Sequence, residues 1–240
     1  MQRRVTRTRD EPRPSTDDRV GTVISRRCFL TIMVALTLSA TTACSSDGNR
    51  RAAVERPRIG DHWHPYLGVN LCGRWLPAVP VFETRDGSVD LGSSGPNIRA
   101  AKRAGIHSHD DFIIHDHPFA RDETGAKNTL GRFLNYAQSK VTASSITLWP
   151  AWAEASYRNG DQCPDSSEPG TLRWKVGRVG EPWPAESRRG DPATIRLRNG
   201  EIIAIYFLPA TAALDEPPGA NAALAQIGDL SGAATTPPSS

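Results

Sequence analysis

The chain has 240 residues, and 29 Lys and Arg against 26 Asp and Glu give it a formal net charge of +3. Residues 1–44 hold 8 of those basic side chains and 4 of the acidic ones, so residues 45–240 carry 21 basic and 22 acidic side chains, a net charge of −1. The basic excess belongs to the first segment, and the remainder has no surplus of the kind that indicates nucleic-acid binding.

The first 44 residues resemble an export leader. Residues 1–24 are rich in Arg, Asp, Pro and Thr, a composition that predicts disorder. Residues 25–30 (Ser-Arg-Arg-Cys-Phe-Leu) resemble the twin-arginine export signal, with Thr31 in place of the lysine that often follows. An uncharged run ends in Thr-Thr-Ala-Cys at 41–44, which resembles a bacterial lipobox with Thr where Leu is commoner. The resemblance implies export, cleavage before Cys44 and lipidation of that cysteine.

We therefore expect a lipoprotein of the cell envelope, anchored by lipid on the outer face of the cytoplasmic membrane, with an extracytoplasmic domain. The alternative is an uncleaved anchor, because the uncharged run from Cys28 to Ser46 has 19 residues, enough to span a bilayer. Both interpretations place the rest of the chain outside the cytoplasm.

The rest of the chain divides into three parts by composition. Residues 45–60 are polar and predict a linker. Residues 209–240 are rich in Ala, Pro, Thr, Gly and Ser and predict a disordered tail with one helical turn near 222–227. Between them, residues 61–208 have the length of one ordinary domain with its own core, and their mixed periodicities predict a single small α+β domain.

One main helix is predicted in this domain. It should begin at a cap on Asn128 or Thr129 and run to about Ser139, with one apolar stripe formed by Leu130, Phe133, Leu134 and Ala137. The strand-like ranges are 66–76, 145–149, 171–176 and 201–208, and loops rich in Pro and Gly fill 77–96 and 154–170. Within 171–176 the apolar side chains alternate with Arg173 and Lys175, which places these two on the opposite face.

The order of a hairpin, a helix, two strands and a last strand resembles the β-grasp, or ubiquitin-like, fold. In that fold the last strand follows a turn similar to Leu-Arg-Asn-Gly-Glu at 197–201. The resemblance covers about residues 66–208 and implies a mixed sheet with one main helix.

All six histidines lie in His-x-His pairs, namely His62/His64, His107/His109 and His115/His117. Because side chains alternate along a strand, each pair puts two imidazoles on one face. Residues 105–117 predict a hairpin that turns near Asp110 and Asp111. A loop of three or five residues would place its four imidazoles on one face, whereas an even loop would place the two pairs on opposite faces.

Imidazole is the commonest protein ligand for transition metals. Six paired rings, with Asp110, Asp111 and Asp116 nearby, therefore predict a site for zinc or copper, with all six histidines as candidate ligands. The alternative is that these histidines have structural or hydrogen-bonding roles.

Residues 107–119 also resemble a bacterial family of secreted or membrane-tethered domains that has no established activity. Its hairpin pattern is His-Thr-His-x-Asp-Gly-x-Ile-His-x-His-Pro-Phe. The matching residues here are His107, His109, Asp111, Ile114, His115, His117, Pro118 and Phe119. Phe112 replaces the glycine, a departure that bears on the geometry of the turn. The resemblance supports grouping the histidines and implies no particular chemistry.

The cysteines separate by position. Cys28 lies in the leader and Cys44 is the candidate for lipidation, which leaves Cys72 and Cys163. An even pair in an oxidising compartment predicts a disulfide. The alternative makes one or both thiolates metal ligands, but neither cysteine lies beside a His-x-His pair.

We expect a metal-binding lipoprotein and binding rather than catalysis. Residues 107–112 come close to the His-x-His-x-Asp-His of metallo-β-lactamase-like hydrolases, but Phe112 stands in place of the final histidine. Two alternatives remain. One is a metal-dependent hydrolase with Asp110 or Asp111 as base. The other is a β-grasp-like module that binds a partner without metal.

Overall fold

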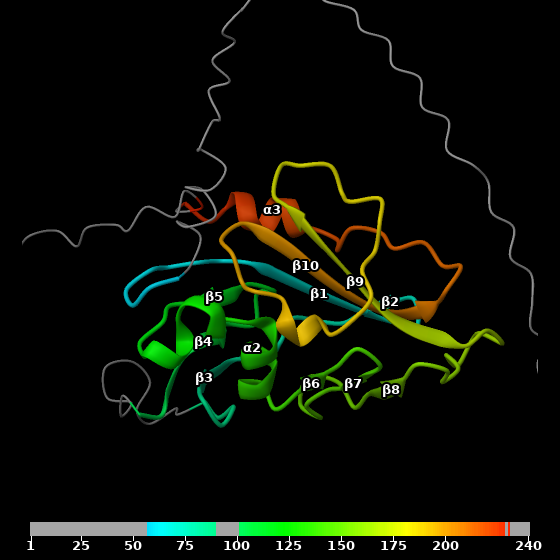
Figure 1. The fold of residues 1–240 in the computed structure, drawn as a ribbon, viewed down its shortest axis with the longest axis horizontal. Coiled ribbons are helices and arrows are strands. Elements are labelled where there is room, and N and C mark those ends of the chain that lie inside the picture. The colour runs from blue at the N-terminus through cyan, green and yellow to red at the C-terminus, as the bar shows by residue number, and fades with distance from the viewer. Residues whose placement is uncertain (1–56, 90–100, 229, 231–240) are drawn as a thin grey trace, which may run out of the picture. The chain divides into compact units, whose positions relative to one another are not determined.

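The computed structural model describes residues 57–89, 101–228 and 230. The leader, Cys44 and most of the expected linker lie outside these residues. The described part has mixed sheets and few helices, as expected for a small α+β domain (Figure 1). Among the described residues, no helix has both the length and the apolar content needed to cross a membrane.

The main sheet has four strands in the order β2-β1-β10-β9. These are β1 (Tyr66–Leu71), β2 (Arg74–Trp75), β9 (Gly170–Arg178) and β10 (Glu201–Pro209). The first strand lies parallel to the last, with Tyr66 opposite Ile202, and β9 runs antiparallel to β10. A turn at Cys72 and Gly73, both with positive φ, divides the single strand expected over 66–76 into β1 and β2.

Both faces of β10 are buried, which explains its continuous apolar run. Ile203, Ile205 and Phe207 pack into the main core with helix α2, while Ala204 and Tyr206 face a second cluster on the other side. The sheet therefore separates two apolar layers, and α2 and α3 lie on opposite sides of it (Figure 1).

Two smaller sheets have three strands each. One consists of β3 (Phe82–Thr84), β4 (Arg103–Ser108) and β5 (Ile114–Asp116), and the other of β6 (Lys140–Val141), β7 (Ser145–Thr147) and β8 (Ser156–Arg158). Strands β3 and β8 fall in ranges that the sequence predicted as loops. We call residues 103–117 the histidine hairpin.

Helix α2 (Leu130–Tyr136) confirms the main predicted helix. The Thr129 side chain accepts a hydrogen bond from the backbone N–H of Arg132, and the four residues of the predicted apolar stripe are buried. The helix ends before the expected Ser139, because Gln138 adopts a φ of +50°. The described residues also form three short 3₁₀ helices: η1 (Arg121–Glu123), η2 (Gly125–Lys127) and η3 (Pro192–Thr194).

The segment after β10 differs from the disordered tail expected from residue 209. Residues 209–218 cross the sheet and lead into helix α3 (Ala220–Ala225), close to the single helical turn expected near 222–227. Arg173 donates to the carbonyls of Pro209 and Ala210, and Lys175 Nζ donates to the carbonyl of Leu214. This segment therefore covers the cationic face of β9. Burial of the two side chains is tolerated because backbone carbonyls replace water as their hydrogen-bond acceptors.

The disulfide between Cys72 and Cys163 is confirmed. It joins the β1–β2 turn to the segment before β9, with 5.3 Å between the two Cα atoms and a sequence separation of 91 between the cysteines. Neither sulfur is therefore available as a metal ligand.

Candidate metal centre

The register of the histidine hairpin decides the parity that the sequence left open. His107 lies opposite His115 in the β4–β5 pairing, and Ser108 lies opposite Ile114. An odd number of residues therefore connects each of these paired positions, and the side chains of both His-x-His pairs share one face of the hairpin. The ring contacts agree, because the centroids of His107 and His115 lie 5.7 Å apart and those of His109 and His115 lie 4.1 Å apart.

The turn of this hairpin uses two residues with positive φ, Asp110 at +63° and Phe112 at +64°. Phe112 occupies the position where the similar hairpin pattern has glycine, the residue that adopts this conformation most readily. Its ring stacks on Tyr66, with centroids 5.5 Å apart and planes at 7°. Packing against the start of β1 thus holds the non-glycine residue in the glycine-like conformation.

The third pair comes from the segment that precedes β1. Trp63 and Asp116 exchange backbone hydrogen bonds of 2.9 and 3.0 Å, so this segment runs antiparallel beside β5. His62 stacks on His117 with centroids 4.1 Å apart. The ring of His64 lies 5.5 Å from His115 and 5.6 Å from His117. All six histidines therefore belong to one connected group of rings.

His64 is positioned by the turn that the sequence linked to the β-grasp fold. Asn199 Oδ1 accepts a hydrogen bond of 2.8 Å from the backbone N–H of His64, and the N–H of Gly200 donates to the His64 carbonyl. The turn at 197–201 thus connects the last strand to the histidine group. No sequence signal marked Asn199 as a residue of this site.

Three of the six histidines can offer ligand atoms to one ion. One ring nitrogen each from His64, His115 and His117 all lie within 4.8 Å of one another, and we call these residues the histidine trio. His117 Nε2 is buried and has no hydrogen-bond partner among the described residues. Buried polar atoms normally have a partner, and a metal ion would supply one here. The histidine trio could therefore hold a metal ion.

Asp111 contacts a member of the trio directly. Its Oδ2 lies 2.9 Å from His115 Nε2, and its Oδ1 accepts a hydrogen bond from the backbone N–H of Ile113. A carboxylate on the second nitrogen of a ligating histidine fixes the orientation of the ring and raises its basicity. Nδ1 of His115 is the ring nitrogen that does not contact Asp111. Asp111 therefore suits the role of orienting His115 better than that of a free base.

The remaining predicted ligands surround the trio. His107 and His109 extend the group beyond His115, and His62 extends it beyond His117. These three contact trio rings without joining the trio itself. Asp116 is completely buried, and both of its carboxylate oxygens accept hydrogen bonds of 2.7 Å from Asn128 Nδ2. Its side chain is engaged there rather than with the imidazoles.

Burial keeps several of the imidazoles neutral. Together with the nearby His109 and His115 rings it lowers the pKa of His107 to about 3, and burial with the surrounding rings lowers the pKa of His117 to about 3. The pKa of His109 is also lowered, mainly by burial. A neutral imidazole has a free lone pair, so these rings need lose no proton before binding a metal at neutral pH.

We expect the stability of the metal-free protein to be greatest near pH 6.5. Below the ordinary histidine pKa of about 6.5, His107 and His117 bind protons in the unfolded chain but stay neutral in the folded protein. The free energy of unfolding therefore falls toward pH 3 by up to ~1.4 kcal/mol per pH unit for each ring. Burial acts oppositely on Asp116, because it raises that pKa to about 8. Between about pH 4 and 8 the folded carboxyl holds a proton that the unfolded chain releases, so stability falls as pH rises.

Below pH 6.5 the combined effect of the two histidines on stability exceeds the opposite effect of Asp116. Between pH 6.5 and 8 only Asp116 of these three groups makes stability depend on pH. Urea unfolding with chelator at intervals from pH 4.5 to 8.5 would measure both slopes. Asp116→Asn should remove the decline above pH 6.5 and make the acid slope steeper, because Asp116 no longer offsets part of the effect of the two histidines. A decline above pH 6.5 that persists in this variant would contradict the assignment.

A second buried carboxylate supports the back of the hairpin. Glu123 is fully buried and accepts hydrogen bonds from the backbone N–H of Gly105 at 3.0 Å and from Tyr136 Oη at 3.2 Å. Arg85 pairs with it at 3.0 Å, and the N–H groups of Phe119 and Ala120 also donate to it. The buried charge is thus fully compensated, as such a charge must be.

Gly105→Ala should destabilise the protein by about 3 kcal/mol, because displacing Glu123 would leave several buried donors without an acceptor. A Cβ at this position would lie 2.3 Å from Glu123 Oε2. Gly228→Ala is the matched control, since a Cβ there meets no atom within 4 Å. Urea denaturation should show the loss in the first variant only. Equal midpoints for the two variants would contradict this account.

Comparisons with protein-family models, with curated proteins and with solved structures find no match to this chain.

Proposed function

We propose that the protein binds a transition metal ion, zinc or copper, through the histidine trio, with the other three histidines as accessory ligands. The observation that carries the proposal is the convergence of His64, His115 and His117 from two separate segments, with their ligand nitrogens within 4.8 Å of one another. The carboxylate partner on His115 adds support, because ligating histidines usually have such a partner.

The chemistry of the donors favours these two metals. Imidazole suits both Zn²⁺ and Cu²⁺; intrinsic affinity favours copper, and availability can favour zinc. Tetrahedral zinc with bonds of 2.0–2.1 Å places its ligand nitrogens about 3.3 Å apart. Binding would therefore draw the three ligand nitrogens together by up to roughly 1.5 Å.

Three imidazoles leave a fourth coordination position. If His62, His107 or His109 fills it, the site is closed, and storage, delivery or a structural role follows. If water fills it, the ion would lower the pKa of that water and permit hydrolysis. The ring contacts of all three histidines with trio members favour the closed site, and we infer binding rather than catalysis.

Elemental analysis of the purified protein, followed by zinc and copper titrations by calorimetry, tests the proposal. We expect about one equivalent of metal per chain, removable by chelator. A protein that takes up neither metal would contradict the proposal and favour a partner-binding role for this surface. Loss of a hydrolytic activity on chelation would favour the open site instead.

We also propose that the domain is extracytoplasmic and tethered by lipid at Cys44. The twin-arginine-like and lipobox-like motifs support this location. The Cys72–Cys163 disulfide adds weak support, because disulfides persist in oxidising compartments.

Cys44→Ala should release the protein from the membrane fraction, because the proposed acceptor of the lipid is removed. Cell fractionation with immunoblotting, together with N-terminal sequencing, would measure retention and processing. Cys28→Ala is the control, since this cysteine lies within the leader and should be dispensable for anchoring. A Cys44→Ala protein that stays in membranes with an intact N-terminus would indicate an uncleaved anchor instead.

The strand order supports the β-grasp interpretation. The first and last strands are parallel neighbours at the centre, with β2 beside β1 and β9 beside β10. We propose that the β1–β2 hairpin takes the place of the first hairpin of that fold. The histidine hairpin would then be an addition that lies against the start of β1.

A further inference from the structure

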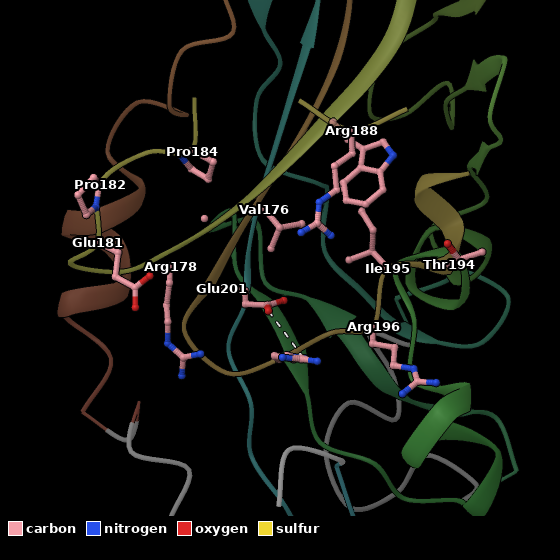
Figure 2. A pocket seen from close by; sticks show the side chains of 13 residues that line it. Val176, Arg178, Glu181, Pro182, Pro184, Arg188, Thr194, Ile195, Arg196 and Glu201 are labelled. Carbon is pink, nitrogen blue, oxygen red and sulfur yellow. Dashed lines mark ion pairs between the residues drawn. The ribbon is translucent and has the colours of Figure 1, made fainter. Parts of the chain in front are cut away.

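A pocket of about 700 Å³, with no histidine in its lining, lies at the end of β9. Its lining comes from β9, from the loop that follows it and from the segment around η3 (Figure 2). It includes four arginines, Arg178, Arg188, Arg196 and Arg198, against two glutamates, which gives a formal charge of +2. We call it the arginine pocket.

Most of this positive charge is uncompensated. Arg198 lies 3.8 Å from Glu201, an ion pair within the pocket wall. Arg178, Arg188 and Arg196 are exposed and make no ion pair with any described residue. Figure 2 shows these three arginines on different parts of the pocket wall, with Glu201 between Arg178 and Arg196. Three guanidinium groups without an ion pair to a described residue therefore line one pocket.

Apolar residues anchored in the main core form one wall of the pocket. Trp174, Val176 and Ile195 belong to the main core or pack against it, so this wall is held by the fold. The Arg188 guanidinium lies over the Trp174 ring, 5.3 Å from its centroid. The indole N–H of Trp174 is buried and has no acceptor among the described residues.

We propose that the arginine pocket binds a small oxyanion with two or more phosphate or carboxylate groups. Guanidinium groups bind both kinds of group in a bidentate manner. The pocket volume lies within the range of sites for small molecules. Three separate arginines suit an anion with more than one charged group better than a single small ion.

Calorimetric titration of the metal-free protein with pyrophosphate, and separately with citrate, tests the proposal. Metal-free protein is used so that neither probe can act by removing an ion. We expect saturable binding of at least one probe, weakening several-fold when NaCl rises from 20 to 200 mM, because salt screens exposed charges. Stronger binding of pyrophosphate would indicate a phosphate ligand, and stronger binding of citrate a carboxylate ligand.

Arg188→Gln combined with Arg196→Gln should weaken binding about tenfold or more, since two charge-assisted contacts are lost. Arg74→Gln with Arg158→Gln removes the same charge from exposed positions outside the pocket and should change the dissociation constant less than about twofold. Glu181→Gln removes a carboxylate from the pocket lining and should tighten binding two- to threefold, roughly the effect of one exposed charge.

The increase in affinity cannot arise from misfolding, so it tests the proposal independently of the double arginine variant. Failure to bind either probe at about 10 mM, or equal weakening in the pocket and control double variants, would overturn the proposal. Zinc and copper titrations should be the same in all of these proteins. The arginine pocket and the metal site therefore succeed or fail separately.

Discussion

His115→Ala combined with His117→Ala should reduce the affinity for zinc and copper by at least about a hundredfold. The two substitutions remove two of the three nitrogens that converge within 4.8 Å, and one ring cannot hold the ion alone. The loss should exceed the 10- to 100-fold typical of removing a residue that only supports a ligand. Calorimetric titration of metal-free protein, with circular dichroism to confirm the fold, measures it.

Matched variants distinguish the trio from the surrounding rings. His64→Ala should weaken binding more than His109→Ala or His62→Ala, although all three remove one imidazole from the same group. Asp111→Asn should cost about tenfold, because it removes the carboxylate partner of His115 and leaves every ligand in place. The trio is the wrong assignment if wild type and the double variant bind both metals equally well. Equal losses at all six histidines would favour a diffuse binding surface.

Cys72→Ser should destabilise the protein by up to ~4–5 kcal/mol, the chain-entropy value for closing a loop of this length. The two cysteines lie 91 positions apart in sequence, so the disulfide restricts a large part of the unfolded chain. For a domain of this size, such a loss corresponds to a melting temperature lower by roughly 10–15 °C. Differential scanning calorimetry of the metal-free protein would measure it.

Cys163→Ser and the double variant serve as controls and should give the same loss, since each removes the same bond. Thiol labelling of denatured, unreduced wild type should find neither cysteine. Two reactive thiols in protein isolated from its own compartment would show that the bond does not form there. In that case Cys72→Ser should change stability little.

Features that depend on neighbours in sequence could be predicted directly. The alternation of side chains along a strand placed each His-x-His pair on one face. The Thr129 cap and the apolar stripe that begins at Leu130 are set by the geometry of one helix. The Cys72–Cys163 bond was predicted because two cysteines remained once the leader had accounted for the others.

Other features required the tertiary structure, because they depend on contacts between distant segments. The parity of the histidine hairpin depends on the β4–β5 register, and the place of His64 in the trio depends on β5 and on Asn199, which is 135 residues away in sequence. The role of Asp111 likewise depends on where the turn carries its carboxylate. Local pattern gives the face of a side chain, but only packing decides what covers that face.

Arg173 and Lys175 show the same division on the opposite side of the sheet. Their alternation with apolar residues correctly placed them on a shared face, and such a face is ordinarily exposed to water. The segment after residue 209 covers it, and backbone carbonyls accept from both side chains. Periodicity by itself determined the hydrophobic pattern, the capped helix and the paired imidazoles. The grouping of three imidazoles that could hold one ion, and the presence of four arginines around one pocket, were decided by long-range packing, which no local spacing encodes.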